Sequence, residues 1–182
     1  GIVDKAESAF ERYKRLAEQL VGIEPDNEEW QAEVGYANSN LGTLLYDQDR
    51  WIEAGEIFSR ELEVAQRSLL VGADNAAEVL RTAQAHAWLA DVRLKQGQFA
   101  ASAQNRVAEI ALYEAMLANN QENSEAKESL AVAKRALGTN LHQQGRTSEA
   151  LEYSTDALNL ALQLVARDPG NANLTERAAQ AY

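Results

Sequence analysis

The sequence predicts an all-α protein, a right-handed α-α superhelix of about eight antiparallel helices stacked as tandem pairs. Three observations predict it. Alanine occupies 33 of the 182 positions, against ten glycines and two prolines, so helix formers far outnumber turn residues. Landmark residues recur every 48 positions. Between the landmarks, apolar residues lie three or four positions apart, a spacing that places them on one face of a helix.

The 48-residue period is marked first by asparagines that follow polar breaks in the chain: Asn27, Asn75, Asn123 and Asn171. Asparagine is a preferred N-cap because its side-chain oxygen accepts a backbone N–H of the first helical turn. Asp26, followed by Glu29 three positions later, also fits a capping box. A second marker, 22 positions after each of the first three asparagines, comprises Asp49, Gly97 and Gly145. Glycine there suits the left-handed residue that ends one helix before the next begins.

Each repeat is therefore expected to contain a first helix (helix A), a tight turn and a second helix (helix B). The A helices are expected at about 28–47, 76–95 and 124–143, and the B helices at about 51–71, 99–119 and 147–167. A B helix at about 3–22 opens the chain and an A helix at about 172–182 closes it. We expect one domain over 1–182: a half repeat 1–24, repeats 25–72, 73–120 and 121–168, and a half repeat 169–182. Residue 1 is Gly, which suggests a fragment of a longer protein.

Leu41-Gly42 in the first full A helix is followed, 12 positions after the glycine, by Ala54-x3-Phe58 in helix B. This pattern resembles the tetratricopeptide repeat (TPR) family. Leu137-Gly138 with Ala150, and Leu89-Ala90 with Ser102, are weaker copies. In this interpretation the small residue at positions 42, 90 and 138 lets helix B approach helix A closely.

The chain departs from the TPR pattern in two ways. Its period is 48 residues rather than the usual ~34, which adds about two turns to each helix and is similar to long-helix bacterial tandem repeats. The aromatic residues of the family motif are also replaced, in helix A by Asn38, His86 and Lys134 and in helix B by Arg106 and Ser154. The resemblance still implies a TPR-like superhelix along the whole chain.

Composition disfavours several function classes. The net charge is −11, which argues against binding to nucleic acid, and no apolar run approaches the ~20 residues of a membrane span. Cysteine is absent, and the two histidines, His86 and His142, occupy different phases of the repeat. With no metal-ligand motif and no phosphate-binding loop, we expect no enzyme, no metal and no cofactor. A cytoplasmic location is expected, with the periplasm left open.

The resemblance implies that the A helices line a concave groove that binds a peptide or a segment of another protein. Carried over by register, the candidate groove residues are Tyr36, Ser39, Thr43, Tyr46 and Asp47 in the first repeat, Gln84, Asp91 and Lys95 in the second, and Arg135, Thr139, His142 and Gln143 in the third.

Among these residues, Tyr46 is expected to be the best anchor and Arg135 the best electrostatic contact. The alternatives are that Tyr46 packs against a neighbouring helix and that Arg135 pairs with a carboxylate. A second function also stays open: a structural spacer or self-association element of a multidomain signalling protein, which could form a homo-oligomer through exposed repeat ends.

Overall fold

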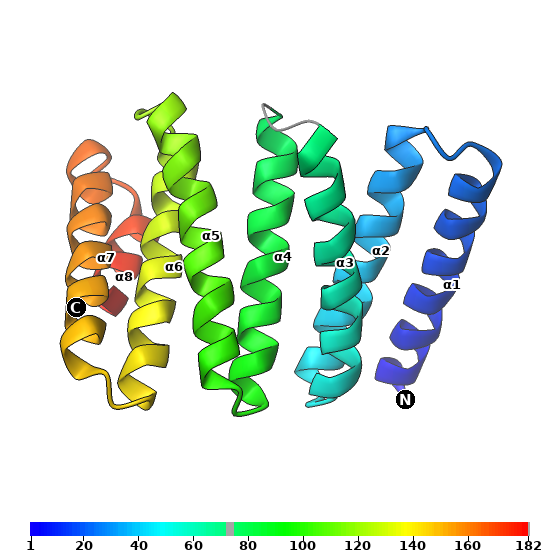
Figure 1. Ribbon diagram of the computed structural model, residues 1–182, viewed down its shortest axis with the longest axis horizontal. Coiled ribbons are helices and arrows are strands. Elements are labelled where there is room, and N and C mark those ends of the chain that lie inside the picture. The colour runs from blue at the N-terminus through cyan, green and yellow to red at the C-terminus, as the bar shows by residue number, and fades with distance from the viewer. Residues whose placement is uncertain (72–74, 182) are drawn as a thin grey trace. The chain divides into compact units, whose positions relative to one another are not determined.

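The computed structural model describes residues 1–71 and 75–181, and within them it is helical without a strand (Figure 1). The helices of this described part are α1 (Ile2–Ile23), α2 (Glu28–Asp47), α3 (Trp51–Val71), α4 (Ala76–Lys95), α5 (Phe99–Asn119), α6 (Ser124–Gln143), α7 (Thr147–Arg167) and α8 (Ala172–Ala181). Their bounds agree with the expected ranges to within one residue, which confirms the all-α prediction. The expected break at Gly72-Ala73-Asp74 and the last residue, Tyr182, lie outside the described residues.

The expected asparagines cap the even-numbered helices. Asn27 Oδ1 accepts the backbone N–H of Glu29 at 3.1 Å and that of Trp30 at 3.2 Å. Asn123 Oδ1 likewise accepts the N–H of Ala126 at 3.0 Å. Because Asn27 is itself the N-cap, Asp26 lies one position before that cap, and the expected capping box of Asp26 with Glu29 is wrong.

Left-handed residues terminate the A helices as expected. The backbone φ angle is 59° at Asp49, 73° at Gly97 and 76° at Gly145. Each residue sits in the short turn that folds an A helix (α2, α4 or α6) back onto the following B helix (α3, α5 or α7). These turns set the antiparallel pairing.

Close approach of helix A and helix B depends on the small residues of the repeat. A Cβ atom added to Gly42 would lie 2.6 Å from Cζ of Phe58, which is 1% exposed. A Cβ atom on Gly138 would lie 2.5 Å from Ser154 Oγ and 3.1 Å from the carbonyl oxygen of Ala150. The expected role of the small residue is therefore confirmed at both glycines.

Two compact units make up the structure, residues 1–64 and residues 65–182, and the division between them falls within α3. In the first unit α1 packs against α2, and Phe58 of α3 packs against Gly42 of α2.

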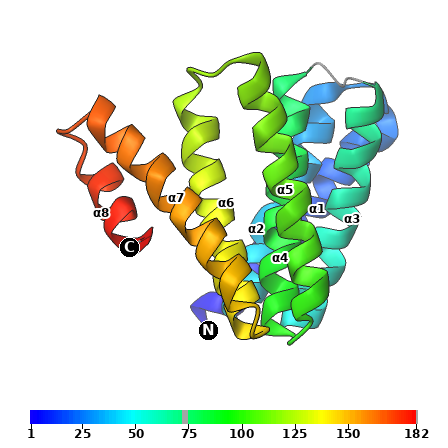
Figure 2. The ribbon, with the colours of Figure 1, turned by 60° about the vertical axis from the view of Figure 1, so that its left-hand side comes forward.

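In the second unit α4 to α8 pack in chain order, each helix against the next (Figure 2). Its core includes Ile110, Tyr113, Leu130, Leu137 and Leu141. None of the helices in the described ranges is both long and apolar enough to cross a membrane. The right-handed superhelix and the single domain over 1–182 stay predictions.

Candidate functional site

None of the twelve candidate groove residues is buried. The exposed ones are Tyr36 and Asp47 on α2, Gln84 and Lys95 on α4, and Thr139, His142 and Gln143 on α6. The half-buried ones are Ser39, Thr43, Tyr46, Asp91 and Arg135. Five of the twelve belong to the first unit, and the other seven lie on α4 and α6 of the second unit. Of the two tyrosines, Tyr36 is the more accessible, with 63% of its surface exposed.

Two candidates on the A helices of the second unit differ in how they are paired. Asp91 forms an ion pair with Arg106 of α5, so its carboxylate is already engaged within the hairpin. Arg135 pairs with no carboxylate among the described residues, whereas its neighbour Lys134 lies 3.0 Å from Asp156 and 3.4 Å from Glu114. Thr139 Oγ1 donates to the carbonyl oxygen of Arg135 at 3.2 Å, which keeps the hydroxyl against its own helix.

A buried polar layer lies between α4 and α5. Arg106, which stands where the first repeat has Phe58, is 6% exposed, and its Nη1 lies 2.6 Å from Oε2 of Glu109. Burial raises the pKa of Glu109 to about 6, although the Arg106 cation opposes that rise. The layer fills the place that an aromatic side chain takes in the first unit.

The two histidines have different surroundings. His86 Nδ1 lies 2.9 Å from Asn105 Oδ1, and burial lowers the pKa of the imidazole, which favours the neutral ring. His142 is exposed on α6. Across the described residues, no group of three or more His, Cys, Asp or Glu side chains is arranged to hold a metal ion.

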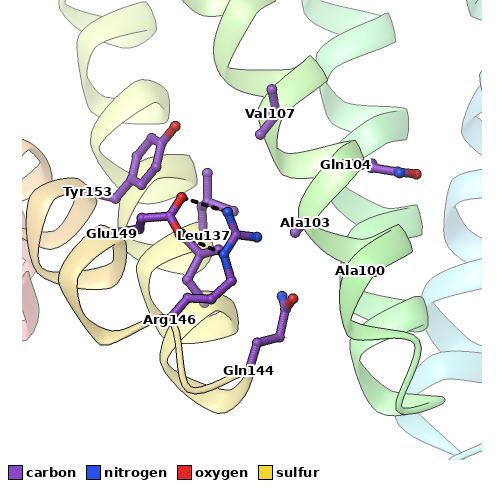
Figure 3. Close-up of a pocket in the computed structure, with 10 residues that line it drawn as sticks. Ala100, Ala103, Gln104, Val107, Leu137, Gln144, Arg146, Glu149 and Tyr153 are labelled. Atoms are coloured by element: carbon purple, nitrogen blue, oxygen red, sulfur yellow. Dashed lines mark hydrogen bonds and ion pairs between the residues drawn. The ribbon is translucent and has the colours of Figure 1, made fainter.

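A pocket of about 360 Å³ opens between α5 and α7, over α6. The buried side chains of Ala103, Leu137 and Leu141 form its floor. Figure 3 shows the guanidinium of Arg146 bonded to Glu149 on the α7 side, and Val107 on α5 across the gap. The complete lining is Ala100, Ala103, Gln104, Val107, Leu137, Leu141, Gln144, Arg146, Glu149 and Tyr153.

The pocket and the candidate A-helix residues lie on opposite sides of α6. Residues 137, 141 and 144 follow one another at steps of four and three, and so share a face of the helix. Residues 135, 139 and 142 are each offset by two positions from that set, which is about half a turn. None of the pocket residues was among the sequence candidates. The signal available in the sequence was the alanine-rich first turn of α5, where Ala100 and Ala103 leave space.

No protein-family model matches this sequence, and no curated protein matches it. Among solved structures, this chain is similar to the crystal structure of BtubC (BKLC) from P. vanneervenii, with a TM-score of 0.68 and 17% sequence identity. The match covers 100% of this chain and 63% of the other, so this chain spans less than two thirds of the length of BtubC. At that identity the likeness shows a shared helical-repeat-like fold.

Proposed function

We propose that this chain is a TPR-like protein-interaction module, not an enzyme. It binds a peptide or protein segment on the A-helix face, by which we mean the sides of α2, α4 and α6 that carry the candidate groove residues. The proposal rests on one helix position that recurs in all three repeats while its side chain differs each time. Asp47, Lys95 and Gln143 occupy the same place at the C-terminal end of α2, α4 and α6, and all three are exposed. Helix ends that recur in the repeat and differ in side chain are suited to recognising one particular partner.

The third repeat offers the fullest set of contacts on this face. Arg135, Thr139, His142 and Gln143 lie on α6, away from the Leu137 and Leu141 floor of the pocket. An arginine that pairs with no carboxylate in the described part of the chain, an amide and an imidazole favour a polar segment that carries an acidic or carbonyl-rich stretch. Tyr36 supplies an exposed aromatic side chain in the first unit.

The experiment begins with selection of peptides from a displayed random library on the immobilised 182-residue chain, followed by calorimetric titration. Arg135→Ala and Thr139→Ala should each weaken the selected peptide by about 5- to 30-fold, the size of an interface contact worth ~1–2 kcal/mol. Thr155→Ala is a matched control, because Thr155 is exposed on the B helix α7. Equal losses in Thr139→Ala and Thr155→Ala, or unchanged binding in both A-face variants, would count against the proposal.

A second candidate function, self-association, is supported by the apolar surface of α1. Leu16, Leu20 and Ile23 follow one another at steps of four and three, and they are 50%, 38% and 71% exposed. The residues 144 positions after Leu16 and Leu20 are Leu160, which is half-buried, and Leu164, which is 4% exposed. Light scattering tests this candidate: the mass should rise above 20.0 kDa with concentration in the wild type and not in Leu16→Glu. A constant monomer mass in both proteins would exclude it.

A further inference from the structure

We propose that the pocket between α5 and α7 is a second docking site, which takes one large aliphatic or aromatic side chain of a protein partner whose neighbouring residues are cationic. This site lies across α6 from the A-helix face. This second site does not depend on binding at the A-helix face, so an experiment can disprove either site without disproving the other.

The floor of the pocket selects an apolar group. Leu137 and Leu141 are 1% and 2% exposed, and Ala103 is 7% exposed, so the floor presents hydrocarbon. Val107 adds an apolar rim with 50% of its surface exposed. A polar side chain placed on this floor would lose its hydration without gaining hydrogen bonds there, whereas an apolar one gains by leaving water.

The open shape of the pocket favours a side chain carried on a polypeptide. The volume of about 360 Å³ lies near the lower end of the ~300–1,000 Å³ of small-molecule sites. The pocket is open to solvent between the two B helices, so a chain lying along the groove can insert one side chain. The amide of Gln144 projects into the gap from the turn between α6 and α7 (Figure 3). Its nitrogen donates to Asn140 Oδ1 at 2.7 Å and to the Phe99 carbonyl oxygen at 3.4 Å, and its oxygen can accept an N–H of a peptide backbone.

Charge at the rim favours cations beside the apolar anchor. The guanidinium of Arg146 and the carboxylate of Glu149 satisfy each other through two hydrogen bonds of 2.7 and 2.6 Å. Glu152 follows on the same face of α7, exposed and without an ion pair in the described part of the chain. The two charges in the lining itself cancel, and Glu152 beside it adds a negative charge, within a chain whose net charge is −11. Lysine or arginine flanking the anchor would meet a complementary field.

Defined peptides test this specificity. The probes are short, terminally blocked peptides of identical length with one guest residue, either Phe flanked by Lys, Ala flanked by Lys, or Phe flanked by Glu. Titration into the ¹⁵N-labelled chain should shift the amide signals of Ala100, Val107 and Gln144 with the first probe. The Ala guest should bind at least about tenfold more weakly. The Glu flanks should weaken binding about threefold or more, by an amount that shrinks as salt is added.

Variants test the location of the site. Ala100→Trp places a bulky ring at an exposed lining position and should abolish the shifts. Ala111→Trp is the matched control: it is exposed on the same face of α5, outside the lining, and should bind as the wild type does. Val107→Asn, which removes the apolar rim, provides a second loss-of-binding variant should Ala100→Trp fail to fold. Thr139→Ala on the A-helix face should leave the titration unchanged, which separates this proposal from the proposed function.

Four titration results would overturn the inference. They are equal binding of the Phe and Ala guests, wild-type binding by a folded Ala100→Trp protein, peptide-induced shifts confined to α4 and α6 on the A-helix face, and toluene alone binding as tightly as the Phe probe. The last result would assign the pocket to a small apolar molecule. Amide signals of the pocket residues that shift with protein concentration, in the absence of any peptide, would indicate that a second copy of the chain occupies the pocket. This result would also overturn the inference.

Discussion

Two arginine–glutamate pairs in the second unit share their chemistry, their spacing of three residues and their distance, but differ in burial. Arg106 Nη1 lies 2.6 Å from Glu109 Oε2, and the side chains are 7% and 4% exposed. Arg146 Nη2 lies 2.6 Å from Glu149 Oε2, and the side chains are 47% and 49% exposed. We predict that replacing the arginine by methionine destabilises the protein far more in the first pair than in the second.

The size of the expected loss of stability follows from the charge that remains buried after the substitution. Arg106→Met leaves the Glu109 carboxylate in a site where the residue is 3% exposed, without its counter-ion. Breaking a buried pair in this way costs about 3–5 kcal/mol, whereas an exposed pair contributes about 0–1 kcal/mol. For a chain of this length, each kcal/mol corresponds to about 2–4 °C in melting temperature, so Arg106→Met should lower it by roughly 6–20 °C.

The same substitution should change the pH dependence of stability. The folded-state pKa of Glu109 is about 6, above its usual 4.5, so ionisation of this group reduces stability as the pH rises through that interval. Arg106 lowers this pKa, and its removal raises the pKa further. The stability deficit of Arg106→Met should therefore grow by about 1 kcal/mol or more between pH ~5 and pH ~8, since one pKa unit is worth ~1.4 kcal/mol.

Urea unfolding followed by far-UV circular dichroism measures both effects, because urea is uncharged and does not screen the pair. Arg146→Met is run in parallel, and Arg106→Met/Glu109→Met should recover most of the loss, since it leaves no buried unpaired charge at that position. An equal cost in the two arginine variants, or a deficit for Arg106→Met that is the same at both pH values, would refute the reasoning.

Three further predictions concern the helix pairs. Gly42→Ala should destabilise by about 1–3 kcal/mol in urea unfolding, because its Cβ would meet the Phe58 ring at 2.6 Å, whereas Gly22→Ala, with nothing within 4 Å, should stabilise α1 by about 0.5–1 kcal/mol. Asn123→Ala removes the oxygen that accepts the Ala126 N–H and should cost about 1 kcal/mol in the same assay; an unchanged midpoint would contradict the capping role. Gly145→Ala should lower the melting temperature by an amount equivalent to about 1–2 kcal/mol, because φ is 76° there; a neutral result would show that the turn relaxes.

The helices could be predicted from the sequence because their limits depend on nearby residues. An asparagine that bonds to an N–H two or three positions later, and a glycine with positive φ, act within a single turn of chain. The 48-residue period repeats each signal, so each helix boundary is indicated by several equivalent residues. The contact of Gly42 with Phe58 could also be predicted, because both residues belong to the pattern of Leu-Gly in helix A and Ala-x3-Phe in helix B.

The pocket and the buried pair could not be predicted in the same way. The pocket exists because Ala100 and Ala103 on α5 are small where Tyr153 on α7 does not fill the gap, and that volume depends on three helices at once. The sequence showed Arg106 in the place of an aromatic residue. It did not show that Asp91 and Glu109 neutralise the guanidinium, because register alone does not determine how far a long side chain reaches.

The chain-order packing of the second unit has a mechanical consequence. Because α8 packs chiefly against α7, and α7 against α6 and α8, tension applied at the C-terminal end is borne by one helix contact at a time. When one contact breaks, the helix that it held can unfold and lengthen. For the 21 residues of α7, the length rises from about 30 Å as a helix to about 70 Å as an extended chain. We therefore expect such a unit to lengthen in steps under tension, and to shorten again as its helices re-form when the tension is released.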